Sequence, residues 1–213
     1  MISAKLVAHT TPTIAVGASN AEEFISYCAR VSNPSNQNNY DTAEGLLKYC
    51  IRNKHFSIFE MVNAVVEVKA PRDITRQMLR HRSFSFQEFS QRYSDEIEFC
   101  DREVRMQDKT NRQNSISIDD FYNGPNQFVR DCWDEDVKEI VELVKEHFKD
   151  QRKIGVAKEV ARVLLPEGLT MSTMYVNGTL RSWLHYLDVR EGNGTQKEHI
   201  ELANKCRKVL EPV

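Results

Sequence analysis

The stretch from Arg80 to Ser94, RHRSFSFQEFSQRYS, concentrates side chains that bind anions. It begins with three cationic or potentially cationic groups, Arg80, His81 and Arg82. Whether the backbone is helical or extended, successive side chains point in different directions, so the three can line different walls of one cleft. Arginine donates paired hydrogen bonds to phosphate oxygens. The run therefore suits a long ligand with several negative charges; a solvated basic turn with acidic partners is the alternative.

A second anion-binding pair, Ser90 and Arg92, follows in the same stretch. If this part of the chain is extended, the two side chains project together, and a hydroxyl beside a guanidinium can hold a phosphate. Glu88 lies among these cations, either as an ion-pair partner or as an acceptor for a ligand. No His–Asp relay is evident beside Ser90 to activate its hydroxyl, so we favour positioning over nucleophilic attack.

Composition limits the kind of partner that these cations could serve. The chain has 213 residues, a net charge of -2 and 28% charged residues, and its pI is about 6.3. Proteins that bind polyanions are usually basic overall, so the anion site must be local. The five cysteines lack CxxC or Cys/His zinc spacing, which predicts reduced thiols and no metal site. No apolar run reaches the ~18–20 residues of a membrane helix, and we expect a cytoplasmic protein without a membrane partner.

The elements that position these residues follow from hydrophobic spacing. Strands are predicted at 3–9 and 61–71, and a polar loop at 106–126. Asn20, with Glu23 three residues later, is typical of a helix start. Strands come early and helices late without regular βαβ alternation, which favours one α+β domain over 1–213. Helices are predicted at 20–32, 42–54, 72–82, 133–148, 156–165, 178–190 and 195–210.

Four segments together resemble the flavin-dependent thymidylate synthases. The motif RHR, seven residues and Ser90 matches the RHR-x7-S signature of that family. HFSIFE at 55–60 resembles its His-x-Ser/Thr-x-Phe-Glu segment, and EVARVLLP at 159–166 resembles its Glu-x-x-Arg-x-x-Leu-Pro helix end. NGTLRSWLHYLDVREGNGTQKEH at 177–199 is similar to the family's C-terminal flavin and nucleotide helix. The resemblance covers nearly the whole chain.

The resemblance implies a reaction and an architecture. Such enzymes convert dUMP to dTMP with 5,10-methylenetetrahydrofolate as one-carbon donor and NAD(P)H as reductant through FAD, and they release tetrahydrofolate. Their fold is a mixed α/β domain with a central antiparallel sheet, assembled as a homotetramer whose active sites combine several subunits. The chain has no Gly-rich dinucleotide fingerprint. Side chains would therefore hold the FAD.

The family pattern also implies a role for individual residues. Arg190 would lie against the uracil ring, where a fixed cation stabilises negative charge that spreads onto the carbonyl oxygens. Arg190 and Ser90 are the two residues that we predict to be catalytic. The residues expected at dUMP are Gln77, Arg80, Glu88, Ser90, Gln91, Arg92, Arg162 and Arg190. The residues expected at FAD are His55, Ser57, Glu60, Arg80, His81, Arg82, Ser83, Glu88, Asn177, Thr179, Arg181 and His185.

The chain departs from the family pattern at two places. Gly194 stands where relatives often carry a His, while Gln196 and Glu198 keep the later pattern. The segment from Asn177 to Arg190 is two residues longer than in shorter relatives. The flavin roles within 177–185 therefore stay open on sequence alone.

Two other functions compete with this interpretation. A nucleic-acid module could use the RHR run and the neighbouring Phe residues as a stacking platform, but the acidic pI and the matches across the helices oppose it. A flavoprotein that lacks methyl transfer could share the cofactor site. Against it, Arg92, Arg162 and Arg190 supply three cations beyond the flavin set, which implies a second, anionic substrate.

Overall fold

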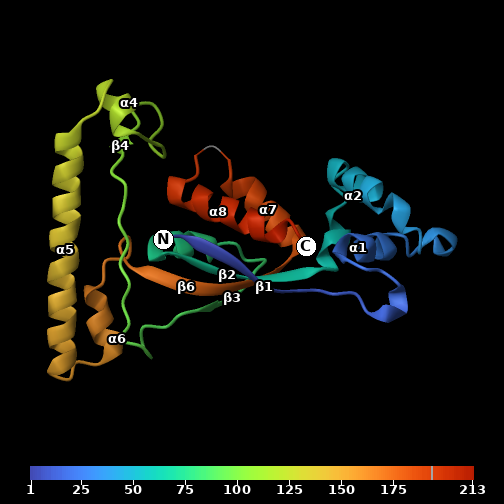
Figure 1. Ribbon diagram of the computed structural model, residues 1–213, viewed down its shortest axis with the longest axis horizontal. Coiled ribbons are helices and arrows are strands. Elements are labelled where there is room, and N and C mark those ends of the chain that lie inside the picture. The colour runs from blue at the N-terminus through green and yellow to red at the C-terminus, as the bar shows by residue number, and fades with distance from the viewer. Residues whose placement is uncertain (193) are drawn as a thin grey trace.

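A four-stranded antiparallel sheet forms the centre of the computed structural model, which describes residues 1–192 and 194–213 (Figure 1). In spatial order its strands are β1 (Ser3–His9), β2 (Asn63–Pro71), β6 (Met171–Thr179) and β3 (Ser85–Glu88). The two central strands thus come from distant parts of the chain. A separate two-stranded ribbon joins β4 (Met106–Gln107) to β5 (Ser115–Ile116).

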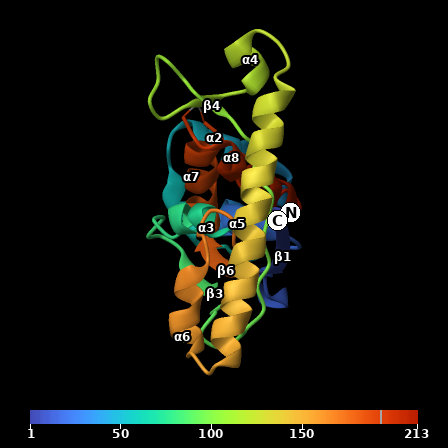
Figure 2. The same cartoon turned by 90° about the vertical axis from the view of Figure 1, so that its left-hand side faces the viewer.

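Helices cover one face of the sheet and both of its ends (Figure 1). Helices α7 and α8 lie over the face, α1 and α2 lie at one end, and α5 stands at the other with α6 beside it (Figures 1 and 2). The helices are α1 (Ala21–Ala29), α2 (Ala43–Arg52), α3 (Arg72–Met78), α4 (Ile118–Tyr122), α5 (Gln127–Lys153), α6 (Lys158–Ala161), α7 (Leu180–Arg190) and α8 (Lys197–Leu210).

The main core lies between the sheet and the helices α3, α7 and α8. Alternate residues of β2, from Ala64 to Ala70, are fully buried, because successive side chains of a strand point to opposite faces. Ile74 of α3, Trp183 of α7 and Leu202 of α8 pack against that face. A smaller core joins α1 and α2 to the 3₁₀ turn Phe56–Glu60. These two cores fix the positions of α3, α7 and the 56–60 turn, which carry six of the predicted site residues: Ser57, Glu60, Gln77, Arg181, His185 and Arg190.

Gly178 is required by the close approach of Phe84 to β6. A Cβ at Gly178 would lie 2.2 Å from Phe84 Cδ1, and the Phe84 ring is already packed on Trp183 with centroids 4.6 Å apart. Gly178→Ala is expected to lower the free energy of unfolding by about 1–3 kcal/mol, as overpacked cores do. Gly168→Ala is the matched control, since that Cβ would meet nothing within 4 Å. Equal urea midpoints for the two variants would contradict this packing.

The structure confirms the mixed α/β fold with an antiparallel sheet and corrects several elements. Strand β6 was not predicted, so the sequence order of strands before helices is wrong, although the α+β class holds. The helix predicted at 72–82 ends at Met78, because the chain turns there to bring Phe84 into the core. The loop predicted at 106–126 contains β4, β5 and α4.

The long helix α5 differs from an ordinary core helix. It covers Gln127–Lys153, well beyond the predicted 133–148. Of its apolar stripe, Phe148 is buried, whereas Ile140 is 46% exposed and the neighbouring Leu143 is 53% exposed. Within one chain this stripe is therefore only partly covered.

Candidate active site

The RHR run lies in the turn between α3 and β3, at the end of α7. Arg190, the last residue of α7, donates from Nε to His81 Nε2 at 2.8 Å and from Nη2 to the Gln77 carbonyl at 3.5 Å. The His81 ring also packs edge-on against Tyr186, with centroids 5.1 Å apart. A cavity of about 690 Å³ opens here. It is lined by Arg80, His81, Arg82, Ser83, His185 and Arg190, all of which were predicted as site residues.

The charges of this cavity are set by burial and by the proximity of its cations. Desolvation, with smaller effects of Arg190 and His185, lowers the pKa of His81 to about 4. His81 is therefore neutral at physiological pH, so its Nε2 can accept the Arg190 hydrogen bond. Burial also lowers the pKa of Arg190. The cavity thus holds the Arg190 guanidinium, fixed by hydrogen bonds, beside a neutral imidazole.

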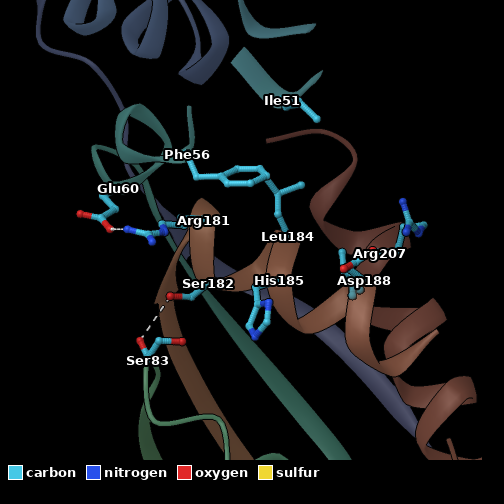
Figure 3. Close-up of a pocket in the computed structure, with 11 residues that line it drawn as sticks. Ile51, Phe56, Glu60, Ser83, Arg181, Ser182, Leu184, His185, Asp188 and Arg207 are labelled. Atoms are coloured by element: carbon cyan, nitrogen blue, oxygen red, sulfur yellow. Dashed lines mark hydrogen bonds and ion pairs between the residues drawn. The ribbon is translucent and has the colours of Figure 1, made fainter. Parts of the chain in front are cut away.

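A second cavity of about 710 Å³ adjoins the first, and Ser83 and His185 line both. Figure 3 shows Phe56 above Leu184 on its apolar side, and the ion pair of Glu60 with Arg181 on its polar side. The remaining lining residues are Ile51, Ser182, Leu187, Asp188 and Arg207. Together the cavities combine an apolar wall suited to a flat ring system with cations suited to phosphates.

Some predicted flavin residues lie outside these two linings. His55 and Ser57 are exposed, and Phe56 between them faces the cavity instead. Asn177 is exposed in β6, next to the buried Val176, so it belongs to the sheet face away from α7 and α8. Thr179 caps α7 by accepting a hydrogen bond from the Ser182 amide at 3.2 Å. Within one chain, the described cavities bring together Glu60, the residues 80–83, Arg181 and His185.

The predicted dUMP residues fall into two groups within one chain. Gln77, Arg80 and Arg190 lie at the C-terminal end of α3, around the RHR cavity. The other group lies at the far end of β3, and four strand residues span about 13 Å. It comprises Glu88, Ser90, Gln91, Arg92 and Arg162.

The far group is organised by ion pairs and by a turn. Arg92 Nη2 lies 3.3 Å from Glu159 Oε2, while Arg162 donates to the Glu159 backbone carbonyl at 3.3 Å. The Glu159 carboxylate therefore pairs with Arg92, while Arg162 contacts the backbone of Glu159. Glu88 accepts from Ser172 Oγ at 2.9 Å and lies 3.5 Å from Arg76 Nη1, so it serves as the ion-pair partner that was one of its two expected roles.

The backbone that begins at Ser90 is a turn, so the extended geometry in which Ser90 and Arg92 would project together does not occur. The amide of Tyr93 donates to the Ser90 carbonyl at 3.1 Å, and the amide of Arg92 donates to Ser90 Oγ at 3.3 Å. Gln91 is only 5% exposed, and its Oε1 accepts from the Arg72 guanidinium. The Gln91 side chain thus holds the turn, which leaves Ser90 and Arg92 at the surface for a ligand.

Sequence reasoning missed several residues of the site. Phe56 occupies a variable position of its motif, and Arg207 lies on α8 far along the chain, so neither carried a signal. Arg72, which holds Gln91, follows Pro71 at the start of α3 and was treated only as part of a helix. Within the described part of the chain, no cluster of His, Cys, Asp or Glu could hold a metal ion. No described helix is long and apolar enough to cross a membrane.

Comparison with known proteins places the chain in a family. Residues 5–213 match the family model described as thymidylate synthase complementing protein. The chain therefore belongs to this family, which confirms the resemblance inferred from the RHR motif.

Its relatives make the assignment more specific. The chain is 46% identical over 213 residues to a probable flavin-dependent thymidylate synthase of Paramecium bursaria Chlorella virus 1, covering 98% of this chain and 94% of the relative. It is 42% identical over 209 residues to the flavin-dependent thymidylate synthase of Synechocystis, covering 97% of this chain and 93% of the relative. A crystal structure of the UMP/dUMP methylase PolB from Streptomyces cacaoi, bound with 5-Br dUMP, superposes with a TM-score of 0.77 at 26% identity, covering 98% and 89%.

Proposed function

We propose that this protein is a flavin-dependent thymidylate synthase. It methylates dUMP to dTMP, takes the one-carbon unit from 5,10-methylenetetrahydrofolate and the electrons from NAD(P)H through FAD, and releases tetrahydrofolate. The observation that carries the proposal is the RHR cavity, since the RHR motif, the adjacent Ser83 and the distant helix α7 supply all six of its lining residues. Chains named for this activity are 42% and 46% identical over almost their whole length.

The two adjoining cavities fit FAD as the cofactor. Arg80 and Arg82 supply side-chain donors for phosphate oxygens in a chain without a glycine-rich phosphate loop. Phe56 and Leu184 offer an apolar wall for a flat ring, and Arg181 is oriented by Glu60. When bound, the flavin supplies hydride chemistry, and the protein contributes binding, orientation and electrostatics.

Arg190 is proposed as the catalytic residue at the pyrimidine. Its guanidinium is fixed by the neutral His81 and by the Gln77 carbonyl, so its position is set before substrate binds. A preorganised cation at the uracil carbonyls stabilises the negative charge that develops on the ring during attack. Ser90, whose hydroxyl accepts from the Arg92 amide, has a positioning role at the nucleotide phosphate.

The division of the dUMP residues supports a homotetramer with shared active sites. Gln77, Arg80 and Arg190 would come from one subunit, and the far group at Ser90, Arg92 and Arg162 would come from a neighbour. The exposed apolar side chains of α5 agree with assembly, because large apolar surfaces of monomeric proteins are usually contact sites. One domain over 1–213 would then build each subunit.

The direct test is the complete reaction under anaerobic conditions. Purified protein should be yellow, and with dUMP, methylenetetrahydrofolate and NADPH it should form dTMP and tetrahydrofolate. Dihydrofolate as the folate product, in an amount equal to dTMP, would instead show that the folate itself supplies the electrons. Flavin-loaded protein that forms no dTMP would exclude the proposed function. The five cysteines, unpaired in the structure, agree with a cytoplasmic enzyme.

A further inference from the structure

A chain of hydrogen bonds runs behind the RHR cavity from Asp73 to His199. Gln196 Nε2 donates to Asp73 Oδ2 at 3.4 Å, and Gln77 Nε2 donates to Gln196 Oε1 at 2.8 Å. His199 Nδ1 lies 3.2 Å from Gln77 Oε1. The chain therefore links α3, which carries Asp73 and Gln77, to the start of α8.

The direction of every bond in this chain follows from Asp73. Arg102 holds that carboxylate with two hydrogen bonds of 3.1 and 3.0 Å, and a carboxylate only accepts. Gln196 must therefore turn its NH₂ group to Asp73 and its oxygen to Gln77. Gln77 then turns its oxygen to His199, so the ring must carry its proton on Nδ1. The second N–H of the Gln77 amide takes no part in this series of hydrogen bonds.

His199 is fully buried, and among the described residues its side chain has a hydrogen-bond partner only in Gln77. Its ring packs against Tyr186 with centroids 5.7 Å apart, and its Nε2 has no hydrogen-bond partner among the described residues. Burial, with Arg190 and His81 nearby, lowers the pKa of His199 to about 3, so the ring is neutral and has a single N–H. A buried polar ring costs stability, and an apolar side chain would fill the space at lower cost.

We propose that His199 is a positioning residue: Gln196 sets the orientation of the Gln77 amide, and the Nδ1–H of His199 holds the amide oxygen in place so that the remaining N–H faces the nucleotide. Gln77 also contacts the predicted catalytic arginine, because its main-chain carbonyl accepts a hydrogen bond from Arg190 Nη2 at 3.5 Å. An amide that turned over would present an oxygen in place of an N–H and would repel a carbonyl or phosphate acceptor. The inference rests on the proposed role of Gln77 at dUMP.

Two substitutions at His199 separate this role from a purely structural one. Asn carries its amide nitrogen as many bonds from Cα as His Nδ1, so His199→Asn keeps a donor for Gln77, whereas His199→Leu fills the space without one. Calorimetric titration of the FAD-loaded enzyme with dUMP should show about tenfold weaker binding for His199→Leu, the loss of about one buried hydrogen bond. His199→Asn should stay within about threefold of wild type.

Thermal unfolding and a third variant complete the test. His199→Leu should be at least as stable as His199→Asn, so the order of stabilities should oppose the order of dUMP affinities. Affinities that simply follow stability, or a His199→Leu enzyme with wild-type affinity, would overturn the inference. Gln77→Ala separates the role of His199 from the role of Gln77. If Gln77→Ala binds dUMP with wild-type affinity, the proposed role of Gln77 at dUMP is wrong as well. If Gln77→Ala loses affinity but His199→Leu does not, only the inference about His199 is wrong.

Discussion

Replacing Arg190 by Ala is expected to lower the turnover of dUMP by about 10²–10³-fold, the usual cost of one preorganised donor at a developing negative charge. Arg190 sits at the end of α7 with its guanidinium fixed by His81 and by the Gln77 carbonyl. Steady-state formation of dTMP with saturating dUMP measures this effect. FAD content should fall far less, because Arg80 and Arg82 remain in the cavity.

Arg190→Lys tests whether geometry or charge alone matters. Lysine keeps the charge but not the planar donors that contact His81 and Gln77 together, so most of the turnover should stay lost. Far-UV circular dichroism and flavin absorbance would show that both variants are folded and loaded. An Arg190→Ala enzyme that loses its flavin, and whose turnover returns to normal with excess FAD, would mean that the cofactor role and the substrate role are assigned to the wrong arginines.

Replacing Arg82 by Ala is expected to produce protein that is purified largely without FAD. The side chain lines the RHR cavity, and without a glycine-rich loop the phosphates depend on side-chain donors. The loss of a charge-assisted hydrogen bond to phosphate is worth about 1.5–3 kcal/mol, or about a tenfold to 150-fold change in affinity. The ratio of visible to ultraviolet absorbance after gel filtration measures the bound flavin.

Arg112→Ala is the matched control for Arg82→Ala, since Arg112 is an exposed arginine in the loop that follows β4. It should keep full flavin content and turnover. Excess FAD in the assay should restore part of the Arg82→Ala activity, because the pyrimidine side of the site is intact. A flavin-replete Arg82→Ala enzyme that fails to bind dUMP would contradict the assignment.

Most of the elements could be predicted from the sequence because their signals are local. Asn20 accepts a hydrogen bond from the Glu23 amide as the capping pattern predicts. Alternation in β2 and the spacing of Ile74 and Met78 in α3 also match the core. Strand β6 was missed because its last residues belong to the motif that continues into α7. Its partner β2 lies about a hundred residues earlier in the sequence, so their pairing has no local signal.

The sequence predicted which residues form the candidate site, but not how they are divided between two separate places in one chain. The RHR motif and the distant Arg190, both predicted as site residues, line one cavity. The same chain separates Ser90 and Arg92 from them, because the turn after β3 lies at the opposite end of that strand. Gln91 and His199 are buried and contact Arg72 and Gln77, far away in the sequence, and such pairings have no local signature.

We propose that each active site combines the RHR cavity of one subunit with the Ser90–Arg92 turn of another. Mixing the subunits tests it most directly, with Arg190→Ala and Arg92→Ala chains co-expressed under two affinity tags and purified through both. Each variant alone should be nearly inactive. Random pairing in a symmetric oligomer should restore about a quarter of the wild-type dTMP formation, because one site in four receives both intact halves. Mixed oligomers as inactive as the two parents would show that one chain supplies both halves and would contradict the account.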